Sequence, residues 1–239
     1  MKLRKEQFLP AITTLSAKFK TDGNSWQDKI KEIDELGLEK VAIFPTCLNK
    51  EQRQEMYNLL EKTQLKEIPF VHLRSDMPPE ELEYLIKKFN TQVFNTHSEK
   101  QYPLVCNLEK YRQQLFIENT FLWDEQEVKN NAGLCLDFSH LESDRLLDQK
   151  KYGQRLAVIK KYKIGCNHIA AVSRNPLAET ENGKTNSLHF DKHSFQDLSE
   201  FDYLKNYPKE FFSEFCAIEV ENSLKEQLKA IDYIYEICR

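Results

Sequence analysis

Histidines and acidic residues recur in this chain at the ends of segments that read as β-strands. All six histidines lie at or beyond the carboxyl end of such a segment, and acidic residues occupy matching places. Imidazoles and carboxylates that meet at one end of a sheet can hold a divalent metal, with zinc and manganese as the candidates. The segments are PFVHLRSD, VFNTHSE, LFIENT, GLCLDFSH, IGCNHIAAVS and CAIEVEN, with HFDKH in the loop after the fifth.

Strand-like and helix-like segments alternate along the whole chain, which predicts βαβ crossovers and a parallel sheet. At 239 residues, eight such units favour an α/β fold of one (β/α)8 TIM-barrel domain spanning residues 1–239. A doubly wound open sheet is the alternative, but no glycine-rich phosphate-binding loop supports it. The expected strands are residues 10–15, 40–46, 68–74, 91–97, 115–119, 133–138, 164–172 and 215–221, and the expected helices are residues 25–36, 50–63, 79–89, 107–113, 124–131, 143–161, 197–206 and 223–237.

The longest stretch without an expected element is 173–196, which we expect to be a loop. A loop of that length in a compact domain is usually functional or mobile. It carries two of the histidines. His193 is a candidate site residue, whereas His189 is expected to be an ordinary loop residue.

Side-chain alternation places the candidate donors on one face of the expected strands. Neighbouring β-branched and leucine side chains take the opposite face, toward the helices. In a barrel the donor face is the interior, and barrel enzymes place their chemistry at the carboxyl ends of the strands. Three buried carboxylates there would need compensating charge, which a divalent cation supplies directly and nearby basic residues supply only in part. The inward set is His72, Arg74, Glu118, Asp137, His168 and Glu219, with Glu221 on the same face.

Composition limits the function classes. The formal net charge is −4 and the pI about 5.9, so broad attraction to nucleic acid is not expected, although a local basic patch remains open. No apolar run approaches the roughly 20 residues of a membrane span, and the first residues do not resemble a secretory signal. The six cysteines include no CxxC pair, which favours reduced thiols in a cytoplasmic protein.

Taken as an ordered set, these residues resemble the xylose-isomerase-like TIM-barrel superfamily. Its members include sugar and sugar-phosphate isomerases and epimerases, and the endonuclease IV family of abasic-site nucleases. The resemblance covers essentially the whole chain. It implies a metal core of Glu on the fifth strand, Asp on the sixth, His on the seventh and Glu on the eighth. The matching residues are Glu118, Asp137, His168 and Glu219, with Glu221 as a rival for the last.

The nuclease branch resembles the chain further. Its strand-five motif is similar to Ile117-Glu118-Asn119-Thr120, its Asp-x-x-His to Asp137 through His140, and its Asp-x-His to Asp191-Lys192-His193. That branch binds three zinc ions. The resemblance implies three ligand sets here, namely His72, His97 and Glu118; Glu118, Asp137, His168 and Glu219; and His140, Asp191 and His193.

The resemblance implies two functions. In an isomerase or epimerase, one or two ions polarise a carbohydrate carbonyl while Glu118 and Glu219 exchange a proton at the neighbouring carbon. The substrate contacts would then come from His140, Arg174 and Arg74. In an endonuclease IV-like phosphodiesterase acting on abasic or damaged nucleic acid, three zincs cleave a phosphoester. The acidic balance favours carbohydrate chemistry, and the fuller ligand set favours the phosphodiesterase. The sequence indicates neither the substrate nor the oligomeric state.

Overall fold

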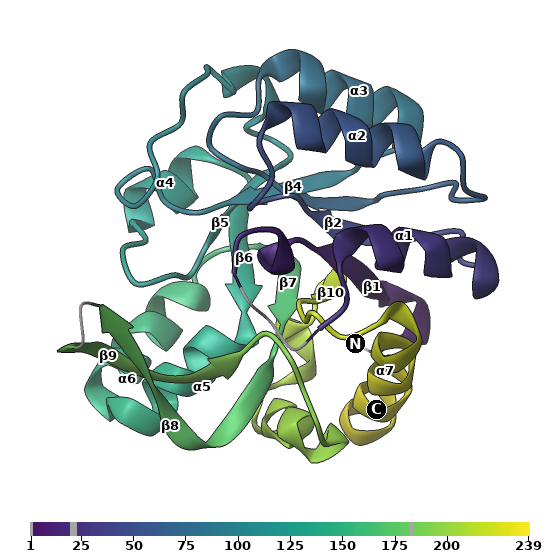
Figure 1. The fold of residues 1–239 in the computed structure, drawn as a ribbon. Coiled ribbons are helices and arrows are strands. Elements are labelled where there is room, and N and C mark those ends of the chain that lie inside the picture. Colours follow the sequence, from purple (N-terminus) through teal and green to yellow (C-terminus); the bar gives the residue numbers. More distant parts are fainter. Residues whose placement is uncertain (1, 20–22, 182–183) are drawn as a thin grey trace.

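The centre of the fold is a closed barrel of eight parallel strands, in the order β1, β10, β7, β6, β5, β4, β3 and β2. The computed structural model describes residues 2–19, 23–181 and 184–239. The predicted (β/α)8 TIM barrel is confirmed (Figure 1). The barrel strands are β1 (Phe8–Thr13), β2 (Ala42–Phe44), β3 (Phe70–His72), β4 (Val93–Thr96), β5 (Leu115–Glu118), β6 (Gly133–Asp137), β7 (Ile164–Ile169) and β10 (Cys216–Ile218).

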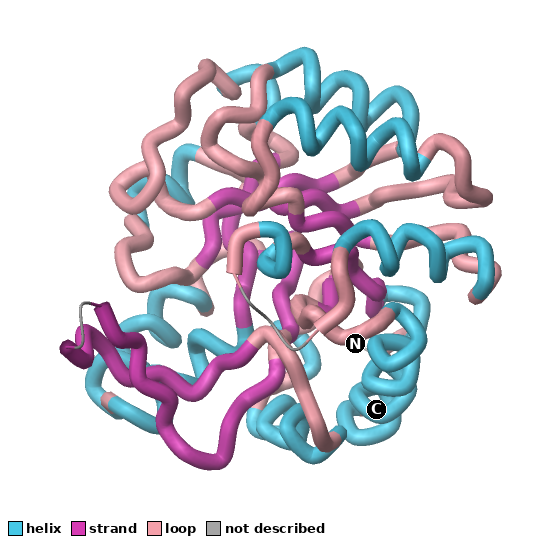
Figure 2. Tube along the Cα trace, in the orientation of Figure 1, coloured by secondary structure: helices cyan, strands magenta, loops and turns pink. Residues whose placement is uncertain are grey.

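Helices surround the strands (Figure 2). Ser25 and Ser223 cap the first and last of the α-helices, since each accepts a hydrogen bond from the backbone N–H three residues later. Within the described residues, no helix is long and apolar enough to cross a membrane. The helices are α1 (Trp26–Glu35), α2 (Lys50–Leu60), α3 (Pro79–Phe89), α4 (Glu125–Asn130), α5 (Phe138–Leu147), α6 (Gln149–Ile159) and α7 (Leu224–Cys238), with 3-10 helices η1 (Lys5–Gln7), η2 (Leu15–Ala17), η3 (Glu109–Tyr111), η4 (Leu198–Asn206) and η5 (Lys209–Phe211).

Two expected helices are broken or shortened. The helix expected over 143–161 is two helices, because Asp148 ends α5 and its side chain caps α6 by accepting from the N–H groups of Lys150 and Lys151. The helix expected over 107–113 is only the single turn η3, since so short a segment forms few helical hydrogen bonds.

The prediction of a loop over residues 173–196 is wrong, because most of this stretch forms an antiparallel hairpin of β8 (Ala171–Glu181) and β9 (Lys184–Lys192). Residues 182–183 of that stretch lie outside the described residues. The hairpin packs beside α5 (Figure 1), where the hydroxyl of Ser143 accepts from the N–H groups of Phe190 (2.9 Å) and Asp191 (3.2 Å). The contact with Ser143 joins the hairpin to α5.

The barrel interior is filled by large and small side chains from alternating positions. Phe44, Phe70 and Phe116 pack against small residues such as Ala217 and Cys166. Two larger apolar clusters lie between the strands and the helices. The interior is therefore closed below the mouth, and the candidate donors gather at the carboxyl ends of the strands.

A β-bulge in β7 sets the direction of the histidine at its end. Leu134 pairs with Ile164 and Cys135 with Cys166, which leaves Gly165 as an extra residue. Ile164 packs in the outer cluster and Cys166 in the interior one. The bulge thus shifts the alternation by one residue, and His168 points into the barrel with Cys166.

We predict that Gly165→Ala destabilises the barrel by about 1–3 kcal/mol, as overpacking does in a filled core. A Cβ at Gly165 would lie 2.0 Å from the Phe116 ring. The matched control is Gly153→Ala in α6, where a Cβ meets no atom within 4 Å, and there alanine should stabilise by up to about 1 kcal/mol. Urea unfolding measures both, and equal stability of the two variants would contradict the packing.

Candidate metal centre

Donor side chains from five strands meet at the carboxyl mouth of the barrel. Most project from strand ends or from the residue just after one, whereas His140 projects from the first turn of α5. Each is buried or half-buried. Three overlapping groups of them have ligand atoms within 4.8 Å of one another. The groups are His72, Glu118 and His168; Glu118, Asp137 and His140; and Asp137, His168 and Glu219.

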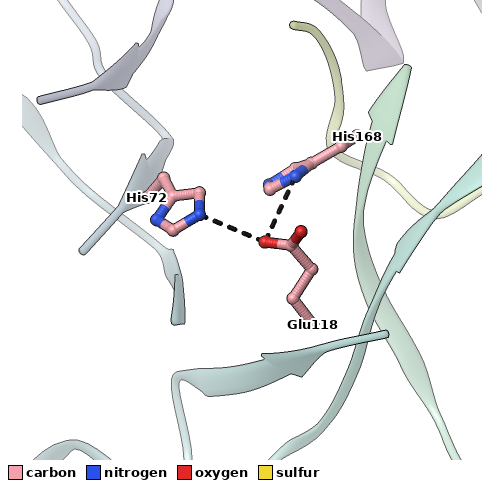
Figure 3. A group of neighbouring side chains, drawn as sticks. All are labelled: His72, Glu118 and His168. Atoms are coloured by element: carbon pink, nitrogen blue, oxygen red, sulfur yellow. Dashed lines mark ion pairs between the residues drawn. The ribbon is translucent and has the colours of Figure 1, made fainter. Parts of the chain in front are cut away.

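Glu118 lies at the centre of the first group. Its Oε2 is 3.1 Å from Nε2 of His72 and 3.5 Å from Nδ1 of His168 (Figure 3). Nε2 of His97 lies 3.5 Å from the same oxygen, and the amide of Asn95 donates to it at 3.0 Å. Nδ1 of His72 is 2.9 Å from the Leu73 carbonyl oxygen, and Nε2 of the same ring faces the Glu118 carboxylate.

His168 joins Glu118 to the second pair of carboxylates. Its Nδ1 is 3.1 Å from Oε2 of Glu219 and 3.9 Å from Oδ2 of Asp137. His140 approaches the same Asp137 oxygen at 3.5 Å. The four residues implied as a metal core, Glu118, Asp137, His168 and Glu219, therefore lie around one point.

Several buried atoms of this core lack hydrogen bonds. Oδ1 of Asp137 caps α5 and accepts from the N–H and hydroxyl of Ser139 and from the N–H of His140. Oδ2 of Asp137 and both ring nitrogens of His168 have no hydrogen-bond partner among the described residues. Buried polar atoms are normally paired. A divalent cation would satisfy these atoms, so the donor set fits a metal.

The pKa values show that the carboxylates favour positive charge at this point. Burial alone would lower the pKa of His168, but Glu118 and Glu219 outweigh it and raise the pKa to about 10. In the same way, Asp137 and Asp191 overcome burial and raise the pKa of His140 to about 9. Opposing burial, His168 lowers the pKa of Glu219 to about 2. A field that holds imidazoles in the cationic form also favours a bound metal ion.

The third implied ligand set is less closely gathered. Asp191 accepts from Ser143 Oγ at 2.9 Å and lines a pocket of about 180 Å³ with His140. Nδ1 of His193 lies 3.9 Å from Oε1 of Glu219. Within the described residues, His140, Asp191 and His193 do not form one of the groups within 4.8 Å.

His189 is closer to the site than its expected role as an ordinary loop residue implies. Its Nδ1 is 3.5 Å from Oδ1 of Asp191 and 2.9 Å from the Asp191 carbonyl oxygen. The alternate spacing of His189, Asp191 and His193 is the signal that could have indicated a strand with one polar face.

The basic residues expected at the mouth are placed differently from one another. Arg74 lines a pocket of about 350 Å³ together with His72 and His97. Arg174 is exposed on the hairpin, where its guanidinium donates to Ser199 Oγ at 3.3 Å, so the structure does not bring it to the cluster.

Glu221 forms a buried ion pair with Lys29 that the sequence did not indicate. Nζ of Lys29 lies 3.4 Å from its Oε2, and the N–H of Leu15 donates to its Oε1 at 3.1 Å. Burial lowers the pKa of Lys29 to about 8. Of the two rival carboxylates, only Glu219 faces the histidine cluster.

Two side chains behind the site fix the ends of β5 and β6. Asn119 accepts from the N–H of Asp137 (2.6 Å) and donates to its carbonyl oxygen (3.0 Å). Buried Arg155 donates to the carbonyl oxygen of Thr120 (2.8 Å) and to Oδ2 of Asp144 (2.6 Å). These contacts hold Glu118 and Asp137 at a fixed spacing.

No protein-family model and no curated protein matches this chain. Among solved structures, a putative xylose isomerase from Rhodospirillum rubrum superposes with a TM-score of 0.51 at 11% sequence identity, covering 97% of this chain and 100% of that chain. The probable 3-DHS dehydratase AsbF of Bacillus anthracis, involved in petrobactin synthesis, gives a TM-score of 0.45 at 15% identity, covering 94% and 98%. The class of fold is thus an eight-stranded TIM barrel. More particularly, the chain shares its fold with that putative xylose isomerase, which is the fold that the sequence resemblance implied.

We predict that Glu219→Gln and Glu221→Gln separate binding from stability. Glu219→Gln removes a donor and should reduce bound metal, and it should destabilise less than Glu221→Gln because Glu118 and Asp137 still lie beside His168. Glu221→Gln leaves Lys29 buried without its partner and should destabilise by on the order of 3 kcal/mol, with metal content retained. Elemental analysis and urea unfolding of both variants measure this. The reverse pattern would make Glu221 the donor.

Proposed function

We propose that this chain is a metal-dependent enzyme that moves a proton between neighbouring carbons of a small carbohydrate, as isomerases and epimerases do. One observation carries the proposal. Glu118 and Glu219 approach the same nitrogen of His168, at 3.5 Å and 3.1 Å, so two carboxylates can serve one reacting centre. The Rhodospirillum rubrum protein is by its name a sugar isomerase, and the shared fold makes sugars the first substrates to test.

The proposed metal ligands are Glu118, Asp137, His168 and Glu219, a mixed nitrogen and oxygen set that suits zinc or manganese. The unpaired Oδ2 of Asp137 and ring nitrogens of His168 support this assignment. When bound, the metal supplies a Lewis acid for a substrate carbonyl and its adjacent hydroxyl.

The protein's own groups would handle the proton. The histidines around Glu118 outweigh its burial and hold its pKa well below the usual range, so it is ionised. Its role as the base would come from its position at the reacting centre and not from a high basicity. Glu219 faces the same centre and can hold or return a proton at the neighbouring carbon. His140, cationic at neutral pH by its raised pKa, can donate a hydrogen bond to a substrate oxygen.

Phosphoester hydrolysis is the second candidate, and one observation favours it. His72 and His97 both approach Oε2 of Glu118, which gives that carboxylate a further set of nitrogen donors. Together with His140, Asp191 and His193, these residues would hold additional zinc ions, with nucleic acid as the substrate class.

We predict that Asp137→Ala and His168→Ala each lose bound metal and activity while the barrel stays folded. The reason is that each change removes a core donor with buried atoms that a cation would satisfy. Elemental analysis and circular dichroism measure the two properties. Arg4→Ala, a change at an exposed residue before β1, is the control. Unchanged metal content in both core variants would refute the site.

We predict that His97→Ala distinguishes the two functions. For proton transfer, the core should keep its metal, and deuterium from D2O should still enter the carbon next to the carbonyl of an accepted ketose. For phosphoester hydrolysis, the variant should lose one ion of three and at least about tenfold of its activity on an abasic-site oligonucleotide. Metal counting, mass spectrometry of the sugar and a cleavage assay decide between them.

A further inference from the structure

A pocket of about 350 Å³ opens beside the histidine side of the cluster, lined by Arg74, Lys18, His72 and His97 among others. We propose that this pocket binds the phosphate group of a small phosphorylated substrate through Arg74 and Lys18. The proposal deepens the proposed function and rests on it for the reacting end of that substrate. The volume of this pocket lies at the small end of the range for ligand sites.

The guanidinium of Arg74 is held by hydrogen bonds at Nε and Nη1, and its Nη2 remains available. Its Nε donates to Oδ1 of Asp76 at 3.0 Å, and its Nη1 donates to the carbonyl oxygen of Thr46 at 3.3 Å. Among the residues that the structure describes, its Nη2 donates no hydrogen bond. A guanidinium with a fixed plane and free N–H groups suits the oxygens of phosphate.

A buried network fixes the residue that holds Arg74. Nη1 of Arg53, which is 1% exposed, donates to the same Oδ1 of Asp76 at 3.1 Å. Its Nε and Nη2 pair with the two oxygens of Glu81, at 2.7 Å and 3.0 Å, and the hydroxyl of Tyr57 also donates to Glu81. The position of Asp76, and through it of Arg74, is therefore set by interactions between α2 and α3.

The remaining charges leave the pocket positive. Lys18 makes no ion pair with any described residue. Lys18 and Arg74 both lie close enough to Cys47 to act against burial, which raises the pKa of its thiol. The nearby carboxylates are already paired, Asp76 with arginines and Glu221 with Lys29. An anion entering the pocket thus meets Lys18, a cation that pairs with no described carboxylate.

The pocket and the cluster share residues, which fixes how a ligand would span them. His72 and His97 line the pocket, and both approach Oε2 of Glu118. A phosphate at Arg74 would place the rest of a small molecule toward Glu118 and Glu219.

The test is binding of inorganic phosphate to the purified protein by titration calorimetry, with and without prior chelator treatment. Arg74→Ala and Lys18→Ala should each weaken phosphate binding by about tenfold or more, as loss of a charge-assisted contact does. Both variants should retain the metal content of the wild type. The matched control is Arg4→Ala, which removes an exposed arginine paired with Glu214 at the other end of the barrel.

The proposal is wrong if the wild type binds no phosphate, or if Arg74→Ala and Arg4→Ala bind phosphate equally well. It is also wrong if glycolate, a small carboxylate used for comparison, binds at Arg74 more tightly than phosphate does. Failure of the proposed function is a separate result. In that case metal or proton exchange is absent while phosphate binding still depends on Arg74. If the pocket assignment is wrong instead, the protein still binds metal and exchanges a proton, but Arg74→Ala does not change its affinity for phosphate.

Discussion

The structure of the mouth depends on one constraint, which is the compensation of buried negative charge. Glu118 and Asp137 are nearly or fully buried, and Glu219 is only partly exposed. Three carboxylates so close together repel one another in a medium where charges are poorly screened. Imidazole rings lie close to all three carboxylates. The carboxylates raise the pKa of His168 to about 10, which shows that they favour positive charge at this point. A divalent cation would compensate the same negative charge without protonation of the histidines, so the donor set fits a metal centre.

The fold serves this constraint by giving site residues structural roles as well. One oxygen of Asp137 caps α5 and the other faces the cluster, so the helix N-terminus holds the carboxylate in its ligand orientation. Asn119 ties the two neighbouring strand ends together. Rigid support of this kind would keep the donors of the proposed metal centre at ligand spacing.

The barrel and the convergence of its donors were predictable from the sequence because both follow from local periodicity. Alternation within a strand indicates which side chains face inward, and parallel strands end at one mouth. The hairpin at 171–192 was missed, although His189, Asp191 and His193 alternate in and just after β9, because most of its sequence is polar and its contact with α5 through Ser143 is not local. Likewise, Glu219 and Glu221 share an alternation pattern, and only the distant Lys29 separates their environments. The bulge at Gly165 also follows from packing against Phe116 rather than from composition.

The mouth has two parts with different charge, and this difference orients a ligand. On the side of β1 to β3, Arg74 and Lys18 face a pocket whose carboxylates are already paired. On the side of β5 to β10, Glu118, Asp137 and Glu219 face one another across His168. A molecule with an anionic end and an uncharged hydroxyl or carbonyl end is attracted in only one of its two orientations, because the reverse brings like charges together. Orientation of this kind needs no close shape fit. Its energy is modest on the side of Arg74 and Lys18, because solvent screens these exposed charges.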